Sequence, residues 1–208
     1  MKQKQKGNIA MIIGAVLIVS ALVLTIYNVG DSMRAGRVSR EALDILIDEI
    51  GKNLAEDADE TTDVQWKWIE GAKIIPEMTT EEIDGNAYIG FVEVPSKGIS
   101  LPVMADWDYD KLKIAPCVYS GSYYTDDLIL AGHNYTSHFG PLTRIGLGED
   151  VYLVTVDGQR IHYIVDYVQT LKDTAIEQMK DDTDWDLTLF TCTLGGQTRC
   201  TVRCIRVE

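Results

Sequence analysis

Cys192 is the residue of this sequence best suited to nucleophilic chemistry. It ends a strand-like run, residues 186–192, and a Gly195-Gly196 turn leads from it into a second strand that carries arginines. The thiolate is the reactive form of cysteine, and an ordinary thiol near neutral pH needs a neighbouring base or positive charge to reach it. The run alone fits a small buried hydrophobic residue equally well, so a catalytic interpretation depends on the partners that the chain supplies.

Three histidines could act as the base. His133 lies in Gly132-His133-Asn134, directly after an apolar strand and at the start of a loop, where functional residues are common. His138 lies farther into that loop and is expected to be exposed. His162 alternates within a strand and is expected to be a structural residue with a satisfied side chain. His133 is therefore the predicted general base.

Arginines of the last strand could stabilise the oxyanion that acyl transfer creates. Arg199 and Arg203 share strand parity and so point to one face, whereas Arg206 points to the other. Arg199 is nearer the start of its strand, which the glycine turn brings beside Cys192. It is the preferred cation. Arg203 and Arg206 are predicted to lie on a solvated strand face.

The elements that must position these residues are short strands separated by Gly and Pro turns. This pattern, with little helix, predicts an all-β closed barrel or a sandwich. One short helix is expected at residues 174–180, and turns are expected at 95–98 and 157–158. The predicted strands cover residues 88–94, 99–103, 127–131, 151–156, 160–171, 186–192 and 199–207.

The N-terminus carries a membrane-anchor pattern. Residues 1–6 form a short basic tail, and residues 7–30 carry no charge and are mostly apolar. At about 1.5 Å per helical residue, such a run can cross a hydrocarbon core of about 30 Å. A cleaved signal peptide is the alternative, but the run is long for one and no A-x-A site follows it. Three arginines between residues 34 and 40 balance three lysines before the run, so charge leaves the orientation open.

Residues 31–86 are predicted to form a helical segment and an acidic linker ahead of a β-domain at 87–208. An apolar stripe at helical spacing predicts packing of the helix on that domain. The stripe consists of Leu43, Leu46, Ile47, Ile50 and Leu54, the acidic linker spans residues 56–63, and Trp66 and Trp68 are expected to dock on the core.

Composition excludes several classes of function. With 208 residues the chain can form one domain of ordinary size plus an appendage. A net charge of −13 without a basic patch argues against nucleic-acid binding. The four cysteines, Cys117, Cys192, Cys200 and Cys204, have no CxxC spacing, so neither a disulfide framework nor a zinc site is expected.

Together these residues resemble the sortase family. Residues 188–192 match the family's TLxTC motif, while 132–134 and 138–142 match its histidine segment. Residues 89–95 and 101–103 resemble its entry strands. The resemblance implies a closed eight-stranded β-barrel and a single-pass, extracytoplasmic cysteine transpeptidase of the Gram-positive cell surface, with the N-terminus inside.

The resemblance also assigns roles. Cys192 would be the nucleophile, His133 the general acid/base and Arg199 the oxyanion-stabilising or substrate-orienting cation. Thr191 and Asn134 would contact substrate, together with the loop at about residues 174–185. Because the turn after Cys192 is short for the family, Arg203 is the fallback cation. No metal or other cofactor is expected.

Subclass and reaction outcome stay open. The helical segment resembles class B sortases, but the connection at 171–186 is short for that class, so a class D-like enzyme is the other option. No Asp-Pro-aromatic lid of the pilin-polymerising class is present. The implied partners are surface proteins with an LPxTG-like or NPxTx-like C-terminal signal and an amine from a peptidoglycan precursor or another donor. The alternatives are a membrane-tethered cysteine endopeptidase and an inactive, sortase-like binding module.

Overall fold

The computed structural model describes residues 2–56, 68–69, 72–73, 76–180 and 184–207. Every strand predicted from residue 88 onward is present with bounds within two residues of the prediction, and the predicted short helix is α2. In chain order, with η for a 3₁₀-helix, the elements are α1 (Lys2–Glu56), β1 (Trp68–Ile69), β2 (Ala72–Lys73), β3 (Glu81–Ile83), β4 (Asn86–Val94), η2 (Pro95–Lys97), β5 (Ile99–Met104), η3 (Lys111–Lys113), β6 (Cys117–Ser120), β7 (Leu128–Gly132), η4 (Gly140–Arg144), β8 (Asp150–Thr155), β9 (Arg160–Lys172), α2 (Ile176–Met179), β10 (Leu187–Cys192) and β11 (Thr198–Arg206).

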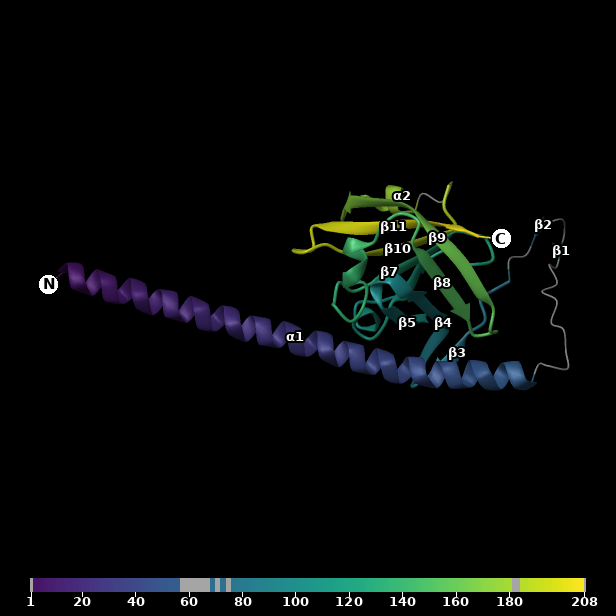
Figure 1. Ribbon diagram of the computed structural model, residues 1–208, viewed down its shortest axis with the longest axis horizontal. Helices are drawn as coiled ribbons and strands as arrows, with labels where there is room; N and C mark the ends of the chain where they lie inside the picture. Colours follow the sequence, from purple (N-terminus) through teal and green to yellow (C-terminus); the bar gives the residue numbers. More distant parts are fainter. Residues whose placement is uncertain (1, 57–67, 70–71, 74–75, 181–183, 208) are drawn as a thin grey trace. The chain divides into compact units, whose positions relative to one another are not determined.

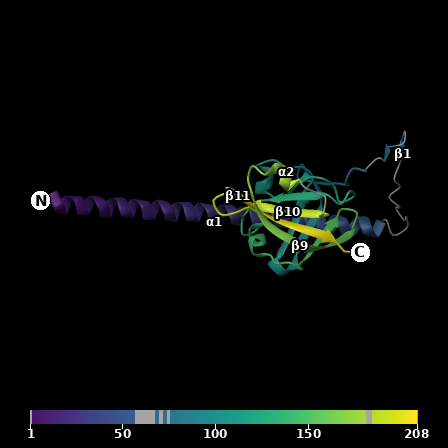
Figure 2. The ribbon, with the colours of Figure 1, turned by 90° about the horizontal axis from the view of Figure 1, so that it is seen from above.

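The large sheet closes into a barrel. Its strand order is β3-β4-β5-β6-β7-β10-β11-β9-β8, and a further pairing of β4 with β8 joins the ends, so eight strands form the ring and β3 adds to β4 from outside (Figure 1). The closed eight-stranded barrel predicted above is confirmed. Strands β9, β10 and β11 lie side by side (Figure 2), and β10 lies between β7 and β11.

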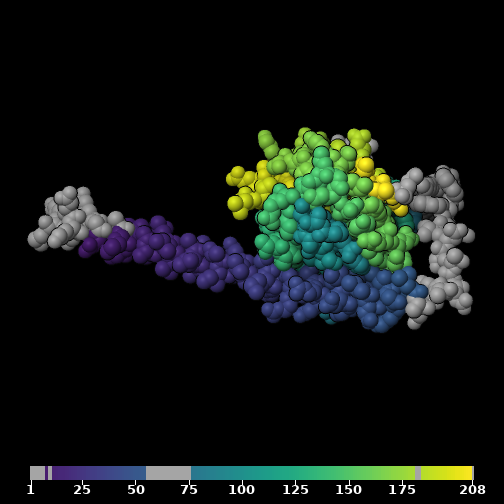
Figure 3. Space-filling view, viewed as in Figure 1, coloured from purple at the N-terminus to yellow at the C-terminus, as the bar shows by residue number. Residues whose placement is uncertain are grey.

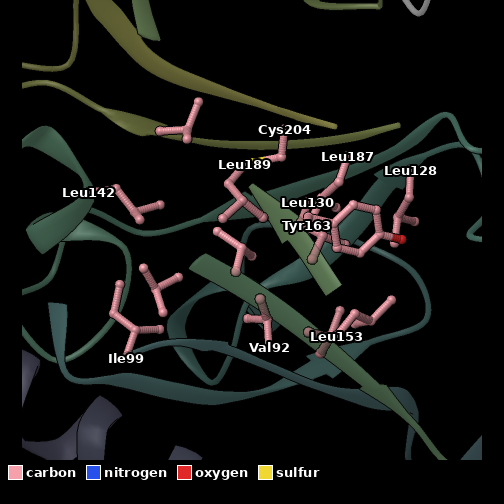
Figure 4. Packing of buried hydrophobic residues seen from close by; sticks show 14 of the residues in the cluster. Val92, Ile99, Leu128, Leu130, Leu142, Leu153, Tyr163, Leu187, Leu189 and Cys204 are labelled. Carbon is pink, nitrogen blue, oxygen red and sulfur yellow. The ribbon is translucent and has the colours of Figure 1, made fainter. Parts of the chain in front are cut away.

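Alternation of apolar residues builds the barrel interior. Leu128 and Leu130 of β7 and Leu187 and Leu189 of β10 are fully buried in one cluster (Figure 4). Closure requires a glycine at position 90, because a Cβ there would lie 1.9 Å from the Val154 carbonyl oxygen of β8. The side chains facing out of β7 and β10 are then free to form a separate surface.

Two strands of the large sheet were not predicted, and neither was the separate pair β1–β2. β6 has only four residues, and β3 has three residues and pairs with β4 alone. Runs this short contain too little alternation to identify, and their positions are set by pairing with neighbours that are distant in sequence. β6 places Tyr119 beside Phe190 of β10.

The helix α1 contributes to two compact units, residues 1–34 and 35–208. In the first unit the apolar side chains are exposed, as at Leu17 and Leu24, and by length and composition this helix could cross a membrane. In the second unit α1 lies along the barrel (Figure 3). There Leu46 and Ile50 pack on a second buried cluster that includes Met104 of β5.

The predicted apolar stripe of α1 is only partly correct. Leu43, Leu46 and Ile50 are buried as expected, but Ile47 and Leu54 are about half exposed. The contact face is narrower than the sequence stripe, because only residues three or four apart on one side of the helix reach the barrel. The acidic linker from residue 57 and Trp66 lie outside the described residues, as does the side chain of Trp68.

Candidate active site

Three neighbouring strand ends bring the predicted chemical groups together. In the antiparallel pair of β10 and β11, Cys192 lies opposite Arg199. In the parallel pair of β10 and β7, Thr191 lies opposite Gly132, so the next residue along β7, His133, comes beside Cys192. The predicted adjacency of Cys192 and Arg199 is confirmed.

These three residues line one cavity of about 250 Å³ on the outer face of the barrel. Its floor comes from β7, β10 and β11, and two connections form its walls. The β5–β6 connection contributes Trp107, Tyr109 and Leu112. The β9–β10 connection contributes Asp173, Ala175, Ile176 and Met179, next to Lys172 at the end of β9. The site is therefore a groove with apolar walls and the thiol, imidazole and guanidinium groups together in its lining.

Arg199 is held by the hairpin that carries it. Its Nη1 donates hydrogen bonds to the carbonyl oxygens of Gly196, at 2.8 Å, and Thr198, at 3.1 Å. Nε and Nη2 donate to no described residue. The guanidinium is therefore oriented by one nitrogen and has others available for a carbonyl oxygen that gains negative charge beside Cys192.

His133 is held by an aromatic neighbour. Its ring stacks on Tyr135, with centroids 4.3 Å apart and planes at 9°. Its backbone carbonyl accepts a hydrogen bond from the Phe139 N–H at 3.1 Å. Phe139 is fully buried and packs so closely on β7 that a Cβ at Gly132 would lie 2.4 Å from its ring. The loop after β7 is therefore a tightly closed support for the imidazole.

Arg203 does not lie on a solvated face, and that prediction is wrong. Its side chain is fully buried, because α2 and Trp185 of the β9–β10 connection cover the outer face of β11. Its Nη1 donates to the carbonyl of Met179 at 3.0 Å and to Thr188 Oγ1 at 2.8 Å, and its Nη2 donates to the carbonyl of Gln178. Arg203 is absent from the cavity lining and fixes the wall of the groove instead.

Arg206, His162 and His138 lie outside the cavity. Arg206 is exposed as predicted and pairs with Asp126 at 3.0 Å. His162 is the expected satisfied strand residue, with Nε2 2.8 Å from Asp150 Oδ1. His138 was expected to be exposed but is fully buried, because the loop folds it against the backbone of Ala35. Burial lowers the pKa of His138 to about 4, so its imidazole is neutral near pH 7.

The two predicted substrate contacts are not brought into the cavity. Strand alternation turns the side chain of Thr191 away from Cys192, and it is 1% exposed. Asn134 lies one residue beyond His133 and is absent from the lining. Of the predicted loop at 174–185, Ala175, Ile176 and Met179 contribute, and residues 181–183 lie outside the described residues.

The sequence analysis did not predict an aromatic wall of the cavity. Trp107 lies 5.5 Å from Tyr119, and Tyr119 makes an edge-to-face contact with Phe190 at 5.3 Å. Phe190 and Cys192 share strand parity, so the rings continue directly from the thiol. The cue was the Trp and Tyr of the polar loop at 106–110, since loops rarely expose such residues without a role.

The other three cysteines are packed inside. Cys117 and Cys204 are fully buried and Cys200 is 6% exposed. Burial raises the pKa of all three thiols, in the case of Cys117 to about 12. Within the part of the chain that the structure describes, no group of three His, Cys, Asp or Glu side chains is arranged to hold a metal ion. Cys192 is thus the thiol that the groove presents.

Comparison with known proteins identifies the family of the barrel. The family model described as Sortase domain matches residues 92–207, more than half of the chain. Sortase C1 of Streptococcus suis is 26% identical, with a TM-score of 0.50, over 58% of this chain and 73% of that one. No curated protein sequence matches the chain.

Two further solved structures share the fold over more of the chain. A sortase D5 transpeptidase of Clostridium perfringens has a TM-score of 0.59 at 13% identity and covers 83% of this chain and 99% of its own. Sortase C of Clostridium perfringens, solved with the C-terminal cell wall sorting motif, has a TM-score of 0.52 at 23% identity. The match covers 88% of this chain and 99% of that one.

Proposed function

Because this chain belongs to the sortase family, we propose that it is a membrane-anchored cysteine transpeptidase that cleaves a C-terminal sorting signal and transfers the protein to an amine. The observation that carries the proposal is the common cavity of Cys192, His133 and Arg199 at the ends of three adjacent strands. A nucleophile, an acid/base and a cation are the groups that acyl transfer through a thiol requires.

In the first half of the reaction the Cys192 thiolate attacks the threonine carbonyl of the signal. The carbonyl oxygen becomes an oxyanion, and Arg199 stabilises it through a guanidinium that its own hairpin has already oriented. As the tetrahedral intermediate collapses, the peptide C–N bond breaks and protonated His133 gives its proton to the leaving amine. The products are the released C-terminal peptide and a thioester on Cys192.

In the second half an amine resolves the thioester. Neutral His133 removes a proton from the incoming amine as its nitrogen bonds to the thioester carbonyl. A second tetrahedral intermediate forms at the same oxyanion position and expels the Cys192 thiolate. The new amide joins the surface protein to the acceptor, for which an amine of a peptidoglycan precursor is the proposed source.

The groove supports an extended peptide as the first substrate. Its apolar walls and the aromatic side chains of Trp107, Tyr119 and Phe190 suit one or two apolar residues ahead of the scissile bond. An LPxTG-like or NPxTx-like signal, with its proline, fits these walls. The sortase C structure solved with a sorting motif supports the same class of substrate.

Membrane attachment rests on the N-terminal part of α1. Its apolar side chains are exposed to solvent in the structure, where burial would otherwise be expected for so apolar a helix. We assign it as a single-pass anchor with the N-terminus in the cytoplasm, which puts the catalytic domain outside the cell beside its substrates.

The test uses the full chain in detergent micelles with a panel of LPxTG-like and NPxTx-like peptides. Intact-mass analysis is expected to detect a thioester adduct on the wild-type protein and none on Cys192→Ala. Cys200→Ala, which changes a buried thiol, is the matched control and is expected to keep the adduct. An adduct of equal yield on Cys192→Ala would overturn the assignment.

The same assay separates transfer from hydrolysis. With an added amine such as triglycine, a transpeptidase yields the amide product at the expense of the free acid. A cysteine endopeptidase yields the acid alone at every amine concentration. An inactive binding module yields neither product, and the rate of Cys192 alkylation then does not change in His133→Ala.

A further inference from the structure

We infer that Tyr135 is a positioning residue for His133, and that α1, acting through His138 and Tyr135, braces the catalytic imidazole. This inference rests on the proposed function, because it takes His133 as the acid/base. It adds a role for two residues of the loop after β7 and for the part of α1 that lies on the barrel.

The first step is the contact between the two rings. Tyr135 and His133 are nearly parallel, at 9°, with centroids 4.3 Å apart. A stacked neighbour restricts rotation of the imidazole while leaving both nitrogens at the ring edge. The Tyr135 ring thus covers one face of the imidazole and helps to fix its plane.

The second step is the rigidity of the loop that carries Tyr135. The Tyr135 carbonyl accepts hydrogen bonds from the N–H groups of His138 and Gly140, each at 3.0 Å. A Cβ at Gly140 would lie 2.6 Å from that oxygen, so the turn is as tight as a glycine allows. The position of Tyr135 is therefore coupled to that of His138.

His138 is packed between Tyr135 and α1. Its ring packs on Tyr135, with centroids 5.4 Å apart, and its side chain is fully buried. The groups that act on its titration are the backbone of Ala35 and the imidazole of His133, and burial outweighs both. A neutral His138 is a fixed packing element between α1 and Tyr135 rather than a second catalytic base.

The fourth step is the contact of α1 with the loop. A Cβ at Gly36 would lie 2.7 Å from the Cβ of Ser137 and 3.1 Å from its Oγ, so helix and loop already touch there. Farther along, Ala42 and Leu46 anchor the helix in a buried cluster of the barrel. The helix is thereby fixed on the barrel and limits how far the loop can move outward.

The expected consequence is kinetic. Because His133 must receive and return a proton in both halves of the reaction, an imidazole displaced by about 1 Å is expected to cost up to about 100-fold in rate. The loss falls mainly on kcat, since the apolar walls that bind the peptide come from other connections.

The first experiment compares Tyr135→Leu with Tyr135→Phe in the full chain. The Leu variant, which loses the stacked ring, is expected to lose about 10- to 100-fold in kcat with little change in KM. The Phe variant, which keeps the ring, is expected to retain most of the activity. If Phe loses as much as Leu, or if both stay at the wild-type rate, ring stacking does not position His133.

A double-mutant cycle tests that Tyr135 acts through His133. The readout is the rate of Cys192 alkylation by iodoacetamide, which reports on thiolate formation. Tyr135→Leu is expected to slow alkylation in the wild-type background and to have no effect in His133→Ala. An equal effect in both backgrounds would mean that Tyr135 acts on Cys192 or on the fold directly.

The helix contact has a matched control on the same helix. Gly36→Ala adds a Cβ against Ser137, whereas Gly51→Ala adds one in open space. Gly36→Ala is expected to lower kcat about tenfold, and Gly51→Ala to leave it within about twofold. Equal activity of the two variants would overturn the bracing role of α1.

The proposed function and the positioning role of Tyr135 and α1 are contradicted by different results. If wild-type protein forms no thioester and His133→Ala leaves alkylation of Cys192 unchanged, the proposed function fails. If His133→Ala abolishes turnover while Tyr135→Leu and Gly36→Ala have no effect, the function stands and the inference fails. Circular dichroism of each variant checks that the barrel is retained.

Discussion

The groove and the packed interior contain the same three reactive residue types, and the structure makes them behave differently. Cys192, His133 and Arg199 line an open cavity. Cys204, His138 and Arg203, which lie 12, 5 and 4 residues after them in the sequence, are fully buried. Residue type and strand position therefore do not distinguish the two groups.

What separates them is the chain that covers each position. Arg199 and Arg203 lie on the same face of β11, but α2 and Trp185 cover only Arg203. There the guanidinium donates hydrogen bonds to two carbonyl oxygens of α2 and to Thr188 Oγ1 of β10. The covering chain thus makes the Arg203 guanidinium part of the groove wall and leaves the Arg199 guanidinium in the lining of the cavity.

The largest expected contrast is in thiol reactivity. In the native full chain, iodoacetamide is expected to label Cys192 at least about 1,000-fold faster than Cys117, Cys200 or Cys204, because burial excludes the reagent and raises their thiol pKa. Peptide mass mapping after short exposure at pH 7.5 measures this ratio. Comparable native labelling of Cys200 would contradict the division into open and buried thiols.

The next contrast is between the two arginines in catalysis. Arg199→Ala is expected to lower kcat/KM by about 100- to 1,000-fold, the cost of losing one oxyanion donor, without changing stability. Arg203→Met is expected to lower kcat/KM far less, when the rate is expressed per folded molecule. Thioester formation with a sorting peptide measures both, and a larger catalytic loss in Arg203→Met would exchange their roles.

For the free energy of unfolding, the order is expected to be the opposite, with the larger loss on replacing Arg203. Arg203→Met leaves Thr188 Oγ1 and two carbonyls without their donor, so the free energy of unfolding is expected to fall by about 2–4 kcal/mol. The exposed Arg206→Met is the matched control and should change it by less than about 1 kcal/mol. Urea unfolding followed by tryptophan fluorescence compares the two, and equal losses would argue against the buried role.

The smallest effect concerns the buried histidine. The folded pKa of His138 lies at about 4, below its ordinary value of 6.5. Between these two pH values only the unfolded chain binds a proton at His138. The contribution of His138 to the free energy of unfolding is therefore complete above pH 6.5 and is lost as the pH falls towards 4. The loss attributable to His138 is about 2–3 kcal/mol.

A variant isolates this contribution from other titrating groups. Unfolding free energies of wild type and His138→Gln are measured between pH 7 and pH 4. The wild type is expected to show the steeper decline, since Gln binds no proton in either state. Parallel curves would mean that His138 is protonated in the folded protein.

Much of the fold was predictable because it depends on local pattern. Alternation located seven of the eight barrel strands, and the turn at Gly195 and Gly196 fixed the pairing of Cys192 with Arg199. β3 and β6 were not predictable, since strands of three or four residues owe their existence to neighbours far away in the chain. The aromatic wall was missed for the same reason, because Tyr119 belongs to β6.

The sequence by itself determined the positions of seven barrel strands, the apolar N-terminal helix and the pairing of Cys192 with Arg199, because each follows from a pattern along one segment or two adjoining ones. Only the tertiary structure decided that Arg203 and His138 are buried and that Tyr135 stacks on His133. Burial and ring contacts depend on which distant segment covers a given face, and no local pattern contains that information.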